Sequence, residues 1–239
     1  MSHATAHHGS RPSPSHIPQL QNGDHLTRAE FERRYDATPG LKKAELIEGV
    51  VYMPPPVSHE YHSGPDADFG GWLSFYRAAT PGVLAGHNGS LRLDLDNMPQ
   101  PDAYLLIAPA CGGQARIDEE GYIVGAPELV GEISASTVSF DMHAKLKVYR
   151  RNGVREYLVW RTLDREIDYF VLREGAYEPL APDTSGIFKS EIFPGLWLDR
   201  NAMLDGDLAA VARVVQQGAA SPEHETFAAK LAARGLDRQ

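Results

Sequence analysis

Cysteine, long apolar runs and excess positive charge are scarce in this sequence, and each scarcity excludes a class of protein. Cys111 is the single cysteine among 239 residues, so neither an internal disulfide nor a cysteine metal cluster can form. No stretch approaches the ~20 apolar residues that a membrane-spanning helix needs. The formal net charge of −9 argues against a generally basic nucleic-acid coat protein, although a local basic patch is still allowed.

Several common catalytic motifs are also missing. The chain has no Gly-rich dinucleotide loop, no phosphate loop ending in Gly-Lys-Ser/Thr and no Gly-x-Ser-x-Gly elbow. The spacing of His59 and His62 does not match the zinc-protease signature. The first 26 residues lack the apolar core of a secretory signal. A reducing, cytoplasmic location is therefore expected.

The composition is that of a globular protein, 42% hydrophobic and 23% charged, and the length suits one domain with appendages. Residues 1–26, which are rich in Ser, His and Pro, are predicted to be a disordered lead-in. Residues 27–200 form the predicted domain, and residues 201–239 a C-terminal helical extension. Helical and strand patterns alternate along the domain, which predicts an α/β fold with a central mixed sheet flanked by helices.

The local patterns predict individual helices and strands. A capping box opens a helix at Thr27. Further helical patterns lie in the second half of 59–79 and over 140–152, 203–217 and 222–235. Strands are predicted as two short segments meeting at Gly49 and over 83–95, 102–108, 127–134, 156–160 and 167–172, with the last two forming a hairpin. Residues 112–125 are predicted to be a polar loop.

Carboxylates inside apolar strands are the first candidates for chemistry. Asp102 opens the run DAYLLIA, Glu132 lies inside ELVGEIS, and Glu45 and Glu48 lie in an equally apolar segment upstream. A buried carboxylate is costly unless it is paired or holds a cation. Three carboxylates that converge would suit Mg²⁺ or Mn²⁺, which prefer oxygen ligands. The alternative is that each carboxylate forms an ion pair at the end of its strand.

A lysine on the helix after Glu132 is the second candidate. Lys145 and Lys147 point about 200° apart on a helix, so only one of them can face the carboxylates. Lys145 is four residues after Asp141 and four before Tyr149, which predicts that these three share one side of the helix. A cation beside a metal and carboxylates is what phosphodiester hydrolysis needs. The alternative is a solvated basic helix face.

The order of these residues, together with the fragments GLKKAELIEGVVYMPPPVSHEYH and SEIFPGLWL, resembles a bacterial branch of the PD-(D/E)XK nuclease superfamily called Uma-two, from about residue 27 to 198. The resemblance implies a restriction-endonuclease-like fold with a divalent metal site. Asp102 matches the aspartate of the family's Pro-Asp pair, Glu132 its second acid and Lys145 its helical lysine. Glu45 matches the upstream glutamate, with Glu48 as its substitute.

The sequence departs from the superfamily's plainest pattern at one important position. Ser134 stands two residues after Glu132, where that pattern has lysine, which makes Lys145 the candidate. The family carries a histidine after its Pro-rich segment, so His59 is predicted to lie near the pocket, with a surface His that caps the following helix as the alternative.

Three functions follow from these residues. The first is a metal-dependent endonuclease acting on DNA, in which Asp102 and Glu132 hold Mg²⁺ (or Mn²⁺), Glu45 holds the metal or a water, and Lys145 orients the attacking water or stabilises phosphorane charge. A homodimer is expected, because cleaving both strands needs two sites. The second is a non-catalytic nuclease-like scaffold, which the net negative charge slightly favours. The third is a glycosidase-type carboxylate pair in a cleft lined by aromatic residues, candidates for which are Tyr52, Trp72 and Tyr104.

Overall fold

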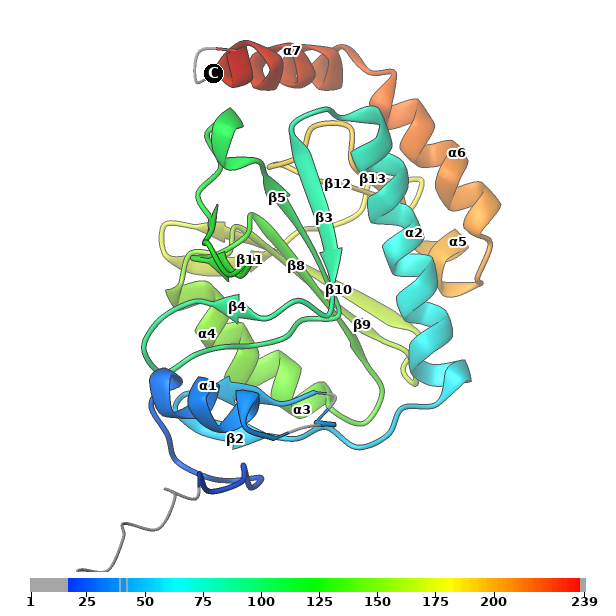
Figure 1. Ribbon diagram of the computed structural model, residues 1–239. Helices are drawn as coiled ribbons and strands as arrows, with labels where there is room; N and C mark the ends of the chain where they lie inside the picture. The colour runs from blue at the N-terminus through cyan, green and yellow to red at the C-terminus, as the bar shows by residue number, and fades with distance from the viewer. Residues whose placement is uncertain (1–16, 39, 42, 237–239) are drawn as a thin grey trace, which may run out of the picture.

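The computed structural model describes residues 17–236 apart from Pro39 and Lys42, and it shows an α/β protein built on a six-stranded mixed sheet (Figure 1). The strand order in this sheet is β11-β10-β9-β8-β5-β3. α2 lies against one face of the sheet, with α6 beside it, and α4 covers the other face (Figure 1). The predicted fold class is therefore confirmed.

The elements before the centre of the sheet carry the first candidate residues. They are α1 (Arg28–Asp36), β1 (Glu45–Ile47), β2 (Val50–Tyr52), the π-helical turn η1 (His59–Ser63), α2 (Gly64–Ala79), β3 (Val83–His87), β4 (Leu91–Arg92) and β5 (Ala103–Ile107). A short 3-10 turn η2 (Pro109–Cys111) and the small strands β6 (Arg116–Ile117) and β7 (Ile123–Val124) follow.

The second half of the chain completes the sheet and adds the C-terminal helices. Its elements are β8 (Leu129–Ser134), α3 (Val138–Phe140), the π-helical turn η3 (Asp141–Lys145), α4 (Leu146–Arg151), β9 (Glu156–Arg161), β10 (Glu166–Arg173), β11 (Ala176–Pro179), β12 (Ile187–Lys189), β13 (Trp197–Asp199), α5 (Arg200–Leu204), α6 (Leu208–Ala219) and α7 (Pro222–Leu236). Within the described residues, no helix is both long and apolar enough to cross a membrane.

β8 is the strand that aims Glu132, because alternate residues of a strand face opposite sides of the sheet. Ile133 belongs to the core under α2, whereas Val130 belongs to the core under α4. Glu132 has the parity of Val130 and therefore faces α4. Gly131 makes close packing possible on the α2 side, because a Cβ at this position would lie 2.3 Å from the Phe69 ring.

Several predicted boundaries differ from the structure. The helical segment begins at His59 rather than midway through 59–79, and the segment 140–152 is divided by a π-helical turn. The predicted loop 112–125 contains two short paired strands.

The lead-in predicted to reach residue 26 cannot extend that far. Leu20 is buried, and the backbone N–H of Gly23 donates to the Val51 carbonyl of β2. Residues 1–16 lie outside the described part of the chain.

Candidate active site

A buried ammonium group surrounded by carboxylates forms the centre of the site. Lys145 Nζ lies 2.9 Å from Glu45 Oε1, 3.0 Å from Glu132 Oε1 and 3.7 Å from Asp141 Oδ1. All four side chains are at most 5% exposed. Because an isolated buried charge is unstable, each of these groups depends on the others for its ionised form. We call Glu45, Asp102, Glu132, Asp141 and Lys145 the carboxylate–lysine cluster.

Three elements hold this cluster together. Glu45 lies on β1, and its Oε1 also accepts a hydrogen bond from the Gln100 backbone N–H at 2.7 Å. Glu132 on β8 accepts a further hydrogen bond, 2.8 Å long, from the Tyr149 hydroxyl of α4. Lys145 ends the π-helical turn η3, and turns of this kind occur frequently at functional sites. The site therefore joins a hairpin, a central strand and a helix.

Asp102 enters the cluster from the neighbouring strand. Ala103 of β5 pairs with Gly131 of β8 in antiparallel register, so one step further along places Asp102 opposite Glu132. Asp102 Oδ2 accepts a hydrogen bond from the Ile133 backbone N–H at 2.8 Å.

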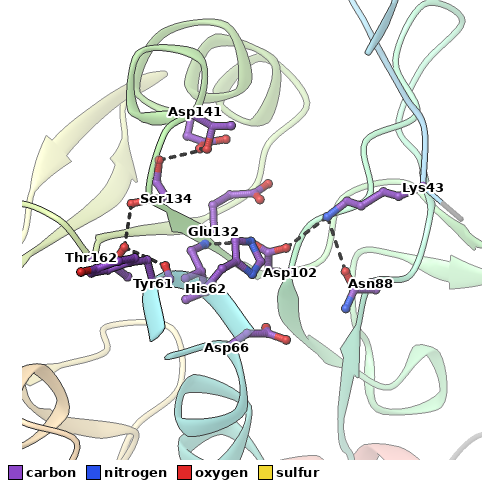
Figure 2. A network of polar contacts seen from close by, with 12 residues as sticks. Lys43, Tyr61, His62, Asp66, Asn88, Asp102, Glu132, Ser134, Asp141 and Thr162 are labelled. Carbon is purple, nitrogen blue, oxygen red and sulfur yellow. Dashed lines mark hydrogen bonds and ion pairs between the residues drawn. The ribbon is translucent and has the colours of Figure 1, made fainter. Parts of the chain in front are cut away.

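Two basic side chains hold the Asp102 carboxylate from the other side. Lys43 Nζ lies 3.1 Å from Asp102 Oδ1, and His62 Nε2 lies 3.5 Å from Oδ2 (Figure 2). Lys43 also reaches Asn88 (Figure 2). Asp102 therefore connects the carboxylate–lysine cluster to the two basic side chains Lys43 and His62.

The pKa values of Asp102 and Glu132 are shifted in opposite directions. Burial alone would raise the pKa of Asp102, but the hydrogen bond from His62 and the charges of Lys43 and Lys145 outweigh it and hold that pKa well below its ordinary value. Burial raises the pKa of Glu132 to about 8, with nearby carboxylates adding to the effect and Lys145 opposing it. Four carboxyl groups lie close to two ammonium groups here, so repulsion between the carboxylates adds to the effect of burial on the pKa of Glu132.

The cluster opens into a cavity of about 720 Å³. Its polar wall includes members of the cluster together with Lys43 and His62. Its other wall is apolar and comes from the segment after β2, from Phe140 and from Leu163. A cavity of this size lies in the ~300–1,000 Å³ range of ligand sites, and it connects the buried charges to the surface.

The structure places the remaining candidates outside this centre or at its edge. Glu48 lies in the β1–β2 turn at φ +53° and forms an ion pair with Arg151 at 2.7 Å, so it is not part of the cluster. Ser134 is buried, with its hydroxyl 3.2 Å from the Thr137 hydroxyl. Lys147 is exposed, as expected for a residue on the opposite side of the helix from Lys145.

The prediction that His59 lies near the pocket is wrong, because a different histidine takes that place. His59 is exposed, its Nδ1 lies 3.3 Å from the Ser63 hydroxyl, and it does not line the described cavity. His62, three residues later, approaches Asp102 instead, because η1 turns this side chain toward the sheet. The sequence pattern placed the helix later than His59, so it could not show which histidine faces Asp102.

Lys43 is the other residue that the motif search missed. It precedes Glu45 by two residues, the spacing that places side chains on one face of an extended segment. Its partner Asp102 is 59 residues away in the chain, so only the fold brings the two together.

The glycosidase-type cleft predicted from three aromatic residues does not form. Trp72 of α2 is fully buried, and its indole N–H donates to the Trp197 carbonyl at 2.9 Å. Tyr104 does not line the described cavity, whereas Tyr52 does.

The pairing of His62 with Asp102 predicts a pH-dependent contribution to stability. The hydrogen bond to Asp102 raises the pKa of His62, and partial burial opposes this. The pair therefore stabilises the fold fully below the ordinary histidine value of 6.5, and this stabilisation is lost as the pH rises through the raised pKa.

Urea unfolding tests this expectation. Substituting His62→Gln should lower the free energy of unfolding by about 0.5 kcal/mol more at about pH 6 than at about pH 9. The matched control is His59→Gln, which removes a histidine that contacts Ser63 rather than a carboxylate. An equal effect of His62→Gln at both pH values would contradict the ion pair.

Comparisons with known proteins agree with this fold. The family model Uma2, described as "Putative restriction endonuclease", matches residues 28–201. A crystal structure described as "a putative nuclease belonging to DUF820 from Anabaena variabilis" has a TM-score of 0.58 to this chain. The two are 14% identical, and the match covers 76% of this chain and 98% of that one, so the likeness concerns the fold alone. A search of curated proteins finds no match.

Proposed function

We propose that this chain, which belongs to the Uma2 family, hydrolyses phosphodiester bonds of DNA with the help of a divalent metal ion. The observation that carries the proposal is the cluster at the base of the cavity, where Asp102 lies opposite Glu132 in the sheet and Lys145 contacts Glu45, Glu132 and Asp141. Carboxylates on adjacent central strands with a lysine on the following helix form the donor set that metal-assisted phosphodiester hydrolysis requires.

The donor set fits a hard divalent ion in its chemistry. Among the described residues, none donates a hydrogen bond to Oε2 of Glu132 or to Oε2 of Glu45, and both residues line the cavity. Mg²⁺ and Mn²⁺ prefer such carboxylate oxygens. The described residues contain no group of three Asp, Glu, His or Cys side chains already arranged to hold an ion. Lys43 forms an ion pair with Asp102, and Lys145 forms ion pairs with Glu45 and Glu132.

We assign the metal to Asp102 and Glu132, with Glu45 at its edge. When bound, the ion would polarise the scissile phosphate and lower the pKa of a bound water. Lys43 and His62 keep Asp102 ionised, so this ligand is ready for a cation at neutral pH. Lys145 donates its N–H groups toward the negative charge that develops on the phosphate, while Asp141 holds its side chain in place.

A DNA-cleavage assay tests the proposal. Purified protein should hydrolyse a labelled DNA strand in Mg²⁺ or Mn²⁺ and not in EDTA, and calorimetry should detect binding of the ion in the absence of DNA. A protein that binds neither ion and cleaves no DNA would support the second function, a nuclease-like scaffold. The closed ion pairs of Lys145 favour that alternative, because they are stable without a metal.

We also propose that the active form is a homodimer, because cleaving both strands of a DNA molecule, at paired or unpaired positions, needs two sites. Light scattering should give the mass of two chains at roughly ten micromolar protein. A monomer under these conditions would contradict the dimer and would limit the protein to one strand at a time. The cytoplasmic location expected from the sequence stays a prediction.

A further inference from the structure

The apolar wall of the cavity is not explained by hydrolysis of a phosphate. A metal, a water and a phosphate need only the polar part of the lining, yet Tyr52, the three prolines 54–56, Tyr61 and Phe140 line the same space. Apolar walls of this kind line the sites of ligands that have a flat or hydrophobic part. The substrate group that neighbours a scissile phosphate and has such a part is a nucleobase.

Two rings of this wall already form a platform. The centroids of Tyr52 on β2 and Phe140 on α3 are 4.2 Å apart, with ring planes tilted by 42°. Both side chains are half-buried, so part of each remains accessible from the cavity. The Lys145 Nζ atom lies 5.7 Å from the centroid of the Phe140 ring. A base that contacts this platform would therefore lie within one nucleotide of the carboxylate–lysine cluster.

Tyr61 stands at the mouth of the cavity on an anchored backbone. Its side chain is 41% exposed and lines the cavity. Its carbonyl accepts a hydrogen bond from the Thr162 hydroxyl at 2.8 Å, and Thr162 N–H donates to the Ser134 carbonyl at the end of β8 (Figure 2). These hydrogen bonds tie the Tyr61 backbone to the end of β8, and exposed Leu163 lines the same cavity.

The charge around the cavity disfavours a paired duplex as the group that enters it. Lys43 and Lys145 line the cavity, but both are already ion-paired to carboxylates, and the described lining residues include no arginine. The whole chain carries a net charge of −9. Duplex binding depends mainly on many contacts between cations and phosphates, whereas unpaired strands gain much of their affinity from bases that stack on aromatic rings.

We propose that the wall formed by Tyr52, Tyr61 and Phe140 is a stacking site for an unpaired nucleobase, and that the substrate of this nuclease is DNA with an unpaired nucleotide beside the scissile phosphate. This inference rests on the proposed function, because it uses the carboxylate–lysine cluster to locate the phosphate. It adds a binding site that distinguishes unpaired DNA from paired DNA.

Binding measurements in EDTA test the site without hydrolysis. Fluorescence anisotropy would compare the wild-type protein and its Tyr61 variants on a labelled single strand, on the same strand with one abasic position and on its fully paired duplex. We expect the single strand to bind at least about tenfold more tightly than the duplex, and Tyr61→Ala to lose about tenfold in affinity for the single strand. Tyr61→Phe, which keeps the ring, should retain it.

The matched control is Phe75→Ala, which removes an exposed aromatic side chain of α2 that does not line the cavity. Equal affinity for strand and duplex, or no effect of Tyr61→Ala, would overturn the stacking site. If the protein cleaves DNA while these binding results fail, the stacking site alone is wrong. If the binding results hold and no condition supports cleavage, the site stands and the proposed hydrolysis is wrong.

Discussion

Replacing Lys145 with methionine should reduce single-turnover cleavage of DNA by about 100-fold or more, the loss typical when a donor that stabilises developing charge is removed. Methionine has a similar length and no charge, so it separates the ammonium group from the volume of the side chain. Lys145 is the group that contacts three carboxylates of the cluster at once, and it is the cation on the helix beside the proposed metal ligands.

The same substitution should destabilise the fold in the absence of metal. It leaves Glu45, Glu132 and Asp141 close together without their shared cation, and breaking a buried ion pair costs about 3–5 kcal/mol. Mg²⁺ should restore much of the loss, because a bound cation replaces the missing positive charge. Urea unfolding with and without Mg²⁺ measures both effects, and it shows whether the variant is folded under the conditions of the cleavage assay.

Lys147→Met is the matched control for this prediction. Lys147 lies two residues further along, exposed and outside the cluster. Its loss should weaken DNA affinity in a salt-dependent manner and leave the chemical step unchanged at saturating protein. Equal loss of the chemical step from both substitutions would mean that this helix only binds the DNA backbone, and Lys145 would have no catalytic role.

Replacing Asp102 with asparagine should remove calorimetric binding of Mg²⁺ and lower cleavage by about 1,000-fold, which corresponds to the several kcal/mol that a metal supplies. Asparagine keeps an oxygen that can accept the hydrogen bond from the Ile133 N–H, so the strand contact can survive. The substitution removes the negative charge of Asp102, the carboxylate that Lys43 and His62 keep ionised.

Asp168→Asn controls for the loss of a carboxylate on the same sheet. Asp168 lies on β10 and forms an ion pair with Arg161 at 2.7 Å, away from the cavity. This variant should bind Mg²⁺ and cleave DNA as the wild type does. If Asp102→Asn keeps wild-type Mg²⁺ affinity, Asp102 is not a metal ligand and the proposed site must be redrawn.

Local signals predicted the elements that carry the site, because they act within a few residues. The apolar runs around Asp102 and Glu132 became β5 and β8, and the turn at Gly49 joined β1 to β2. The four-residue spacing from Asp141 to Lys145 brought these two side chains to within 3.7 Å, even though the turn between them is π-helical rather than α-helical.

Contacts between segments that are distant in the chain could not be predicted from local sequence patterns. The pairing of Lys43 and His62 with Asp102 requires three segments to pack together: the residues just before β1, the turn η1 and the residue just before β5. No local sequence pattern predicts that these segments are in contact. The choice of histidine depended on where η1 begins, a boundary that sequence patterns place poorly. The predicted residue was therefore one helical turn too early.

By itself, the sequence determined the α/β class, the order of the acidic residues and the candidate lysine, since periodicity and motif spacing are properties of the chain alone. Only the tertiary structure decided which acidic residues share a site. Glu45 faces the cluster from a paired strand, whereas Glu48 lies in the turn at positive φ and reaches Arg151 on the surface. The physical reason is that burial and electrostatic pairing depend on which segments pack together, and packing is a property of the whole fold.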